Sequence, residues 1–150
     1  MTDTGQLNIG PLQLNLRAEN VGPLRYSAPG HRGFFTAGRR PPEPGPLMTA
    51  EVEIVKRITL LPGSEPVWRG GQSWAAWDAG ADLLCCSGFQ VPGRVRFGCR
   101  VARDLSRAEL ALDPEWADTH EDGRESPLRF PLDQVLAWGM LARIGGALLH

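Results

Sequence analysis

One stretch of sequence indicates the fold class most clearly: Val95-Arg96-Phe97-Gly98-Cys99-Arg100-Val101, in which every second residue is apolar. Successive side chains of a β-strand point to opposite faces of a sheet, so this period of two predicts a half-buried strand. The stretch Leu12-Gln13-Leu14-Asn15-Leu16-Arg17 alternates in the same way, and a third alternating run lies within residues 49–61. We therefore expect a β-sheet to form the core of the protein.

Glycine and proline divide the rest of the chain into short segments. The sequence contains 18 glycines and 13 prolines among 150 residues, a composition that favours short strands joined by tight turns. Further strands are expected at residues 7–9, 67–76, 81–89 and 109–112. The proline-rich segment 37–46 and the acidic segment 116–126 are expected to be exposed connections.

Near the end of the chain the apolar residues change to helical spacing. The residues with this spacing are Leu132, Val135, Leu136, Met140 and Ile144. Pro131 suits a first helical turn and Gly145-Gly146 suits a helix end, so a helix is expected over 131–144. Residues 147–150 are expected to begin a strand. The predicted class is α+β, mainly β: an antiparallel sheet of six to eight short strands with one C-terminal helix, in a single domain over 1–150.

Composition excludes several classes of function. The formal net charge is −1, with 22% charged and 42% hydrophobic residues, which argues against a disordered chain and against a basic nucleic-acid binder. No run of about 18 apolar residues suggests a membrane span, so neither nucleic acid nor a membrane is an expected partner. The first residues lack the basic and apolar regions of a secretion signal, so a cytoplasmic location is expected.

The three cysteines, Cys85, Cys86 and Cys99, do not have the spacing of a zinc site or of a disulfide framework. Adjacent cysteines in a strand point to opposite faces of the sheet, so Cys85 and Cys86 would not share a metal. We expect three buried, apolar thiols and no metal site.

No catalytic constellation is recognisable in the sequence. The phosphate-binding pattern G-x-x-x-x-G-K-[ST] is absent, because the single lysine, Lys56, follows Val55 in an expected strand. Six residues are candidates for binding: the neighbouring tryptophans Trp68, Trp74 and Trp77, and the arginines Arg94, Arg96 and Arg100 of one predicted strand. The tryptophans could stack on a ligand or fill the core, and the arginines could bind an anionic group or form a solvated strand face.

The C-terminal sequence resembles a known family. Pro127-Leu128-Arg129-Phe130-Pro131-Leu132-Asp133-Gln134-Val135-Leu136, followed by Gly145-Gly146-Ala147-Leu148-Leu149-His150, is similar to the segment that precedes the phosphate-binding loop in relatives of HPr kinase. These are bacterial serine kinases with a phosphoenolpyruvate-carboxykinase-like catalytic core. The close similarity covers about the last 25 residues, and that to the rest of the chain is diffuse.

The resemblance implies that this chain is the N-terminal β-rich region of such a protein, ending just before the catalytic core. It implies a non-catalytic domain that packs on a kinase core in cis or in trans and helps to hold a protein or peptide substrate. ATP and Mg²⁺ would then belong to that core, and the chain itself would carry no cofactor. Only His150 corresponds to a residue of the family, as the histidine on the strand that enters the core.

Two hypotheses of different classes therefore stand, ahead of a third, a small enzyme with a cysteine or histidine site. The first is the non-catalytic kinase-associated domain, and the second is an autonomous binding module that uses the tryptophans and the arginine strand for a peptide or small ligand. An unpaired strand edge at 147–150 would also favour homo-oligomers.

Overall fold

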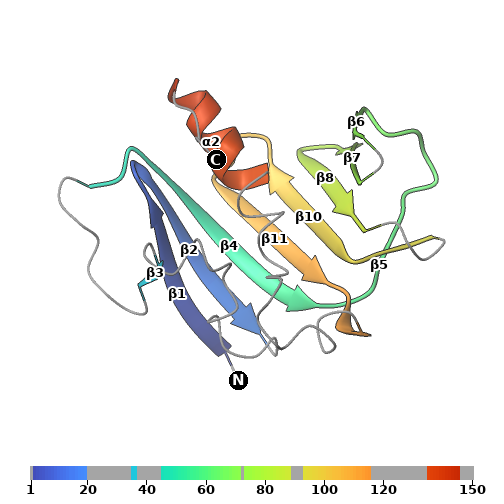
Figure 1. Ribbon diagram of the computed structural model, residues 1–150, viewed down its shortest axis with the longest axis horizontal. Helices are drawn as coiled ribbons and strands as arrows, with labels where there is room; N and C mark the ends of the chain where they lie inside the picture. Colours follow the sequence, from blue (N-terminus) through green and yellow to red (C-terminus); the bar gives the residue numbers. More distant parts are fainter. Residues whose placement is uncertain are drawn as a thin grey trace.

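The protein is a strongly β-rich molecule built on one large sheet (Figure 1). The computed structural model describes residues 2–19, 35–36, 45–71, 73–88, 93–115 and 135–145. The N-terminal strands are β1 (Thr2–Ile9), β2 (Leu12–Glu19), β3 (Phe35–Thr36), β4 (Met48–Lys56) and β5 (Thr59–Leu60). The later elements are β6 (Trp68–Gly70), β7 (Trp74–Ala79), β8 (Asp82–Ser87), β9 (Arg94–Val95), β10 (Phe97–Ala102), β11 (Arg107–Leu112) and the helix α2 (Trp138–Arg143).

Nine of these strands form one sheet in the order β3-β1-β2-β4-β11-β10-β8-β7-β6, and β5 pairs with β9 in a separate small sheet. The predicted β-rich class with a C-terminal helix is confirmed. Most neighbouring strands are antiparallel as expected, but β2 and β4 run parallel, and so do β4 and β11. The parallel pairs join strands far apart in sequence, a feature that the alternation of side chains does not encode.

The structure has more strands than predicted, because three expected strands are each divided in two, while β1 and β11 are longer than the strands expected at 7–9 and 109–112. Residues 67–76 form β6 and β7, which are separated by a turn in which Gly71 has a φ of +61°. The run at 49–61 is divided into β4 and β5. The run from Arg94 to Val101 bends at Arg96, whose backbone still bonds to the large sheet while Arg94 and Val95 pair with β5.

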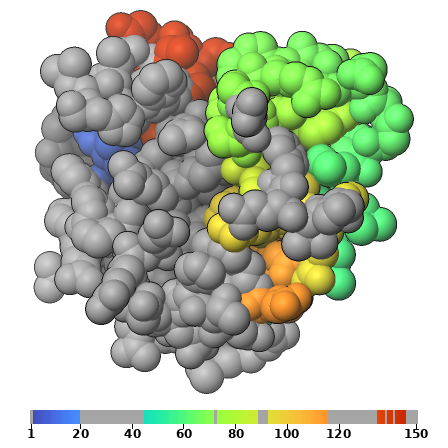
Figure 2. All heavy atoms as spheres, turned by 45° about the vertical axis from the view of Figure 1, so that its right-hand side comes forward, coloured from blue at the N-terminus to red at the C-terminus, as the bar shows by residue number. Residues whose placement is uncertain are grey.

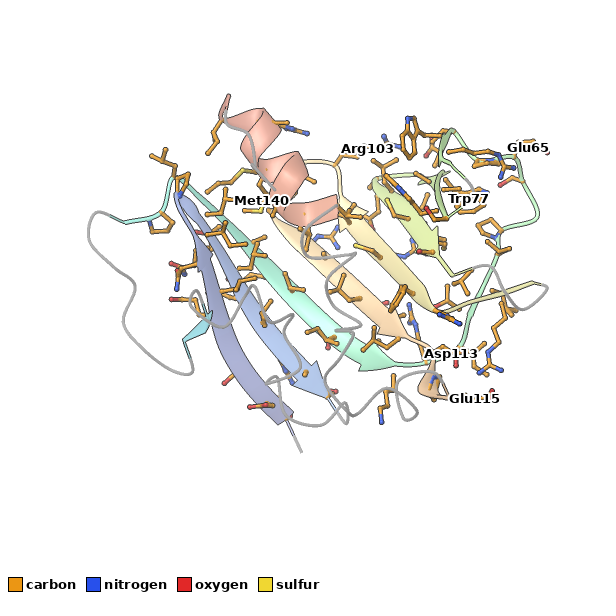
Figure 3. The ribbon with its side chains drawn as sticks, viewed as in Figure 1. Glu65, Trp77, Arg103, Asp113, Glu115 and Met140 are labelled. Atoms are coloured by element: carbon orange, nitrogen blue, oxygen red, sulfur yellow. The ribbon has the colours of Figure 1, made fainter. Side chains whose placement is uncertain are left out.

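The apolar residues that alternate along the strands form the main core on one face of the large sheet. On β2, Leu12, Leu14 and Leu16 are buried, and Val52 and Leu110 continue the same layer on β4 and β11. The C-terminal helical segment covers this face. It begins with a π-helical turn at 135–137 and continues as α2, and Leu136 and Ala137 are fully buried against the sheet. Met140, on α2, is also fully buried there (Figure 3).

The predicted helix at 131–144 is thus observed from residue 135, and residues 131–134 lie outside the described part of the chain. Arg143 donates a hydrogen bond to the carbonyl of Arg103, and Gly145 follows the helix with a φ of +73°. Leu105 is the one described non-glycine residue with a positive φ (63°), and it packs against the helix at Gly139. None of the described helices is both long and apolar enough to cross a membrane.

The second face of the large sheet has two different halves. Over β10, β8 and β7, the segment that carries β5 packs on a smaller core of Ala75, Trp77, Cys86 and Val95, with Leu61 and Leu84 at its margin. Figure 2 shows the segment from β5 to β8 as a continuous surface beside β10 and β11. Over β1, β2, β4 and β11, in contrast, the second face carries polar and charged side chains, and this half contains the candidate site.

Candidate functional site

The polar half of the second face is built by the alternate residues of the same strands that build the core. Strand register places Thr4, Arg17, Glu53, Glu109 and Arg100 in one row across β1, β2, β4, β11 and β10. A parallel row contains Gln6, Asn15, Glu51 and Arg107. Because β1, β2, β4 and β11 turn their apolar residues toward the main core, their alternate polar residues are gathered on the second face.

A groove of about 620 Å³ lies along these two rows. Its polar lining residues are Thr4, Asn15, Arg17, Glu51, Glu53, Arg100, Arg107 and Glu109. The volume is within the range of ligand sites, roughly 300–1,000 Å³. Because the lining contains three arginines and three glutamates, its formal charge is zero. We call it the mixed-charge groove.

A second hollow of about 330 Å³ adjoins the mixed-charge groove, since both are lined by Arg100 and Glu109. Its other lining residues are Arg57, Ile58, Thr59, Leu60, Leu84, Gly98 and Ala111. The hollow forms where the chain around β5 crosses the sheet at Gly98, at which a Cβ atom would lie 2.9 Å from Cγ2 of Thr59. Three large apolar side chains, Ile58, Leu60 and Leu84, line it beside the charged Arg57, Arg100 and Glu109, and for these three we call it the apolar hollow.

Several charges of the mixed-charge groove are already paired. Arg17 forms an ion pair with Glu19 at 2.6 Å, Arg107 with Asp82 at 3.2 Å, and Arg57 with Glu109. Glu51 accepts a hydrogen bond of 2.7 Å from the Asn15 amide. Among the described residues, neither Glu53 nor Arg100 has an ion pair or a side-chain hydrogen bond. Both side chains are exposed. One carboxylate and one guanidinium are thus available to a ligand.

A network of amides borders the groove on β1 and β2. The side chains of Gln6 and Gln13 both donate to Oδ1 of Asn15 at 3.0 Å, and Asn8 donates to Gln6 at 3.2 Å. This network holds the Asn15 side chain in the orientation that lets its own amide donate to Glu51. Oε1 of Gln13 is buried and has no hydrogen-bond partner among the described residues.

The three predicted arginines do not share one strand face. Arg94 lies on β9 and forms a bidentate ion pair with the buried carboxylate of Asp113, and it also contacts Glu115 at 3.4 Å. The hydrogen bond to Asp113 is the main cause that raises the pKa of Arg94 above its usual value. Arg96 lies at the bend and packs its Cβ over Gly88. Only Arg100 lines the groove, so the predicted arginine surface is not assembled.

The three predicted tryptophans are also separated. Trp68 and Trp74 pair on the face of the main core, with ring centroids 4.3 Å apart and planes inclined by 43°. Trp77 lies on the opposite face of the sheet, where it is buried, and its indole donates a hydrogen bond of 2.9 Å to the carbonyl of Ser64. Trp74 and Trp77 are an odd number of residues apart in one strand, and this parity sends them to opposite faces. A single stacking platform is therefore not formed.

The cysteines are buried and unpaired, as expected. Burial raises the pKa of Cys85 to about 11 and, together with the neighbouring Cys85, that of Cys86 to about 12. Burial also raises the pKa of Cys99 well above its usual value. These thiols are protonated at neutral pH and are poor nucleophiles. No cluster of histidine, cysteine or carboxylate side chains suited to a metal ion occurs in the described ranges, and His150 lies outside them.

The residues of the mixed-charge groove other than Arg100 were not among the predicted binding residues. Their signal is present in the sequence as the polar parity of residues 12–17 and 51–54, but each run alone is typical of a solvated strand face. Only the strand order brings Arg17, Glu53 and Glu109 to neighbouring positions. Comparison with known proteins adds no further assignment, because no family model, curated protein or solved structure matches the chain.

Proposed function

We propose that the protein is a non-catalytic domain that packs on a kinase-like core, in cis or in trans, and helps to hold the protein or peptide substrate of that core. The sequence at 127–136 and 145–150, which resembles relatives of HPr kinase, supports the association with a kinase. The mixed-charge groove is the observation that carries the substrate-holding role. A polypeptide presents both signs of charge, and the groove offers both.

The same groove is unsuited to the triphosphate of a nucleotide. Each of the arginines Arg17, Arg100 and Arg107 has a glutamate beside it in the strand rows, and these carboxylates repel phosphate oxygens. Phosphoryl transfer needs a cradle of backbone N–H groups with a lysine and a metal ion, and the chain has no glycine-rich loop followed by a lysine. ATP and Mg²⁺ are therefore assigned to the kinase-like core.

Nucleotide binding gives the first test. Titration calorimetry of the purified 150-residue chain with Mg-ATP is expected to show no tight binding, and a phosphate-release assay is expected to show no hydrolysis. ATP turnover that co-purifies with the chain through two different columns, in constant proportion to it, would contradict the proposal.

The association with a core gives the second test. The DNA that follows the codon for His150, or a neighbouring gene, is expected to encode G-x-x-x-x-G-K-[ST] within a kinase-like core. In the joined or reconstituted protein, removing residues 2–145 should abolish phosphorylation of the protein substrate and leave ATP hydrolysis by the core. Equal phosphorylation of that substrate with and without these residues would show that the domain does not hold it.

A further inference from the structure

We propose that the mixed-charge groove and the apolar hollow together bind an extended peptide segment that carries a basic side chain, an acidic side chain and an apolar side chain in that spatial order. This inference rests on the substrate-holding part of the proposed function and specifies its chemistry. Glu53 would bind the basic group, Arg100 would bind the acidic group, and the surface around Leu60 and Leu84 would contact the apolar residue.

Glu53 and Arg100, the two lining charges without a partner among the described residues, define the spacing of the ligand. Glu53 and Arg100 lie on β4 and β10, with only β11 between them. Neighbouring strands are about 4.8 Å apart, so the two backbone positions are separated by about 10 Å. In an extended peptide, side chains on one side recur about every 7 Å. The length of a lysine or arginine side chain covers the difference between this spacing and the separation of the two backbone positions. A basic and an acidic residue at positions i and i+2 therefore match the groove.

The residues between and around the two free charges are held in place. Glu109 lies between Glu53 and Arg100 in the row, and it is engaged by Arg57. Arg107 is engaged by Asp82, and Asn15 holds Glu51. These pairs limit competition for Glu53 and Arg100 within the protein. A ligand that supplies the opposite charges would complete the pairing along the row.

The apolar end follows from the next strand in the same row. Leu84 on β8 lies opposite Arg100, and it lines the apolar hollow with Ile58 and Leu60. Ile58 is 55% exposed and Leu60 is 69% exposed, although both are large apolar side chains. A peptide that continues past Arg100 reaches these residues. An apolar residue two positions beyond the acidic one would remove them from water.

Other occupants fit the surface less well. Nucleic acid and free phosphate require a positive site, and the lining arginines are balanced by an equal number of glutamates. A single zwitterionic amino acid could not reach both charges and the apolar hollow, because its charged groups lie on one carbon atom. A peptide can satisfy all three positions at once.

A random heptapeptide library displayed on phage, selected against the immobilised full chain, tests the proposal. The wild-type chain should enrich peptides with Lys or Arg two positions from Asp or Glu and an apolar residue two positions further, in either chain direction. Arg100→Glu should replace the acidic preference by a basic one, and Glu53→Lys should replace the basic preference by an acidic one. A synthetic peptide selected by the wild type should bind each variant about five-fold more weakly, as the loss of one exposed charge pair implies.

The matched control is Arg69→Glu, which reverses an exposed charge on β6 that lines neither hollow and should leave the selected peptides unchanged. Circular dichroism shows that each variant is folded. Selection of no peptide, or of the same peptides by the wild type and both groove variants, overturns the proposal. So does binding of phosphate, an oligonucleotide or a second copy of the chain that Arg100→Glu abolishes. The selection needs no kinase-like core, so the peptide proposal can fail while the core still associates with the domain. Failure of this inference is therefore distinguishable from failure of the proposed function.

Discussion

Substitution of Gly70 by alanine tests whether the pair of Trp68 and Trp74 is a structural unit at the end of the large sheet. A Cβ atom at position 70 would lie 2.2 Å from Nε1 of Trp74 and 2.6 Å from Cζ3 of Trp68. Both distances are far below van der Waals contact, so both indoles must move. Trp68 is 49% exposed and can turn into solvent, whereas Trp74 is partly buried against the main core and must shift there.

The expected cost is therefore at least that of the aromatic pair. Ring pairs of this kind contribute about 0.5–1.5 kcal/mol beyond the area they bury. Gly63→Ala is the matched control, because a Cβ atom there meets nothing within 4 Å. Both variants lose the same backbone freedom in the unfolded chain, so the difference between them isolates the indole pair. Gly70→Ala should have a free energy of unfolding lower than that of Gly63→Ala by at least about 0.5–1.5 kcal/mol.

Urea denaturation followed by far-ultraviolet circular dichroism measures this difference. The two coupled indoles should also produce a circular-dichroism couplet in the wild type and in Gly63→Ala, and the couplet should vanish in Gly70→Ala. Equal stability of the two variants, with the couplet retained in both, would refute the reasoning. In that case the indoles would not occupy the positions that leave no room for a side chain at residue 70.

Two further predictions concern the cores. Met140→Ala should lower the free energy of unfolding by about 2–5 kcal/mol in urea titrations, because Met140 is fully buried between helix and sheet. The control Ile144→Ala, at a 37% exposed position, should change the free energy of unfolding by less than about 0.5 kcal/mol. The buried thiols should make stability depend on pH in the alkaline range: their pKa values are raised in the folded state from 9.0 to about 11 and about 12 for Cys85 and Cys86, so this contribution is complete below about pH 9 and is lost as the pH rises above it. A variant with alanine at all three cysteines should lose less stability between pH 8 and pH 11 than the wild type, as measured by urea denaturation in the two buffers, and an equal loss would contradict the assignment.

Much of the local structure follows from side-chain alternation. The strand around Leu12–Leu16 was predicted close to its observed position because its apolar residues alternate, and β8 was predicted because turn residues bound its continuous apolar run. The divided strands were not predicted. At Arg96 the residue pattern continues unbroken, and the bend arises because Arg94 and Val95 pair with β5 while Asp113 holds the Arg94 side chain.

The candidate site was largely missed for a related reason. The binding residues were predicted from tryptophans and arginines that are neighbours in sequence. In the structure, Trp77 faces away from Trp68 and Trp74, and Arg94 forms an ion pair with Asp113. The groove instead combines single residues from strands that are distant in sequence. No short motif marks such a combination.

The amino-acid order alone shows that the protein is mainly β and which residues of a strand face the core. Both can be derived because the period of two is a local property of the extended backbone. The two parallel pairings of β4 with β2 and β11 are a tertiary decision, since they depend on how remote strands bury their apolar faces together. Those pairings place Glu53 in the same row as Glu109 and Arg100. The proposed binding surface therefore exists only in the folded sheet, where non-local contacts convert separate polar positions into one groove.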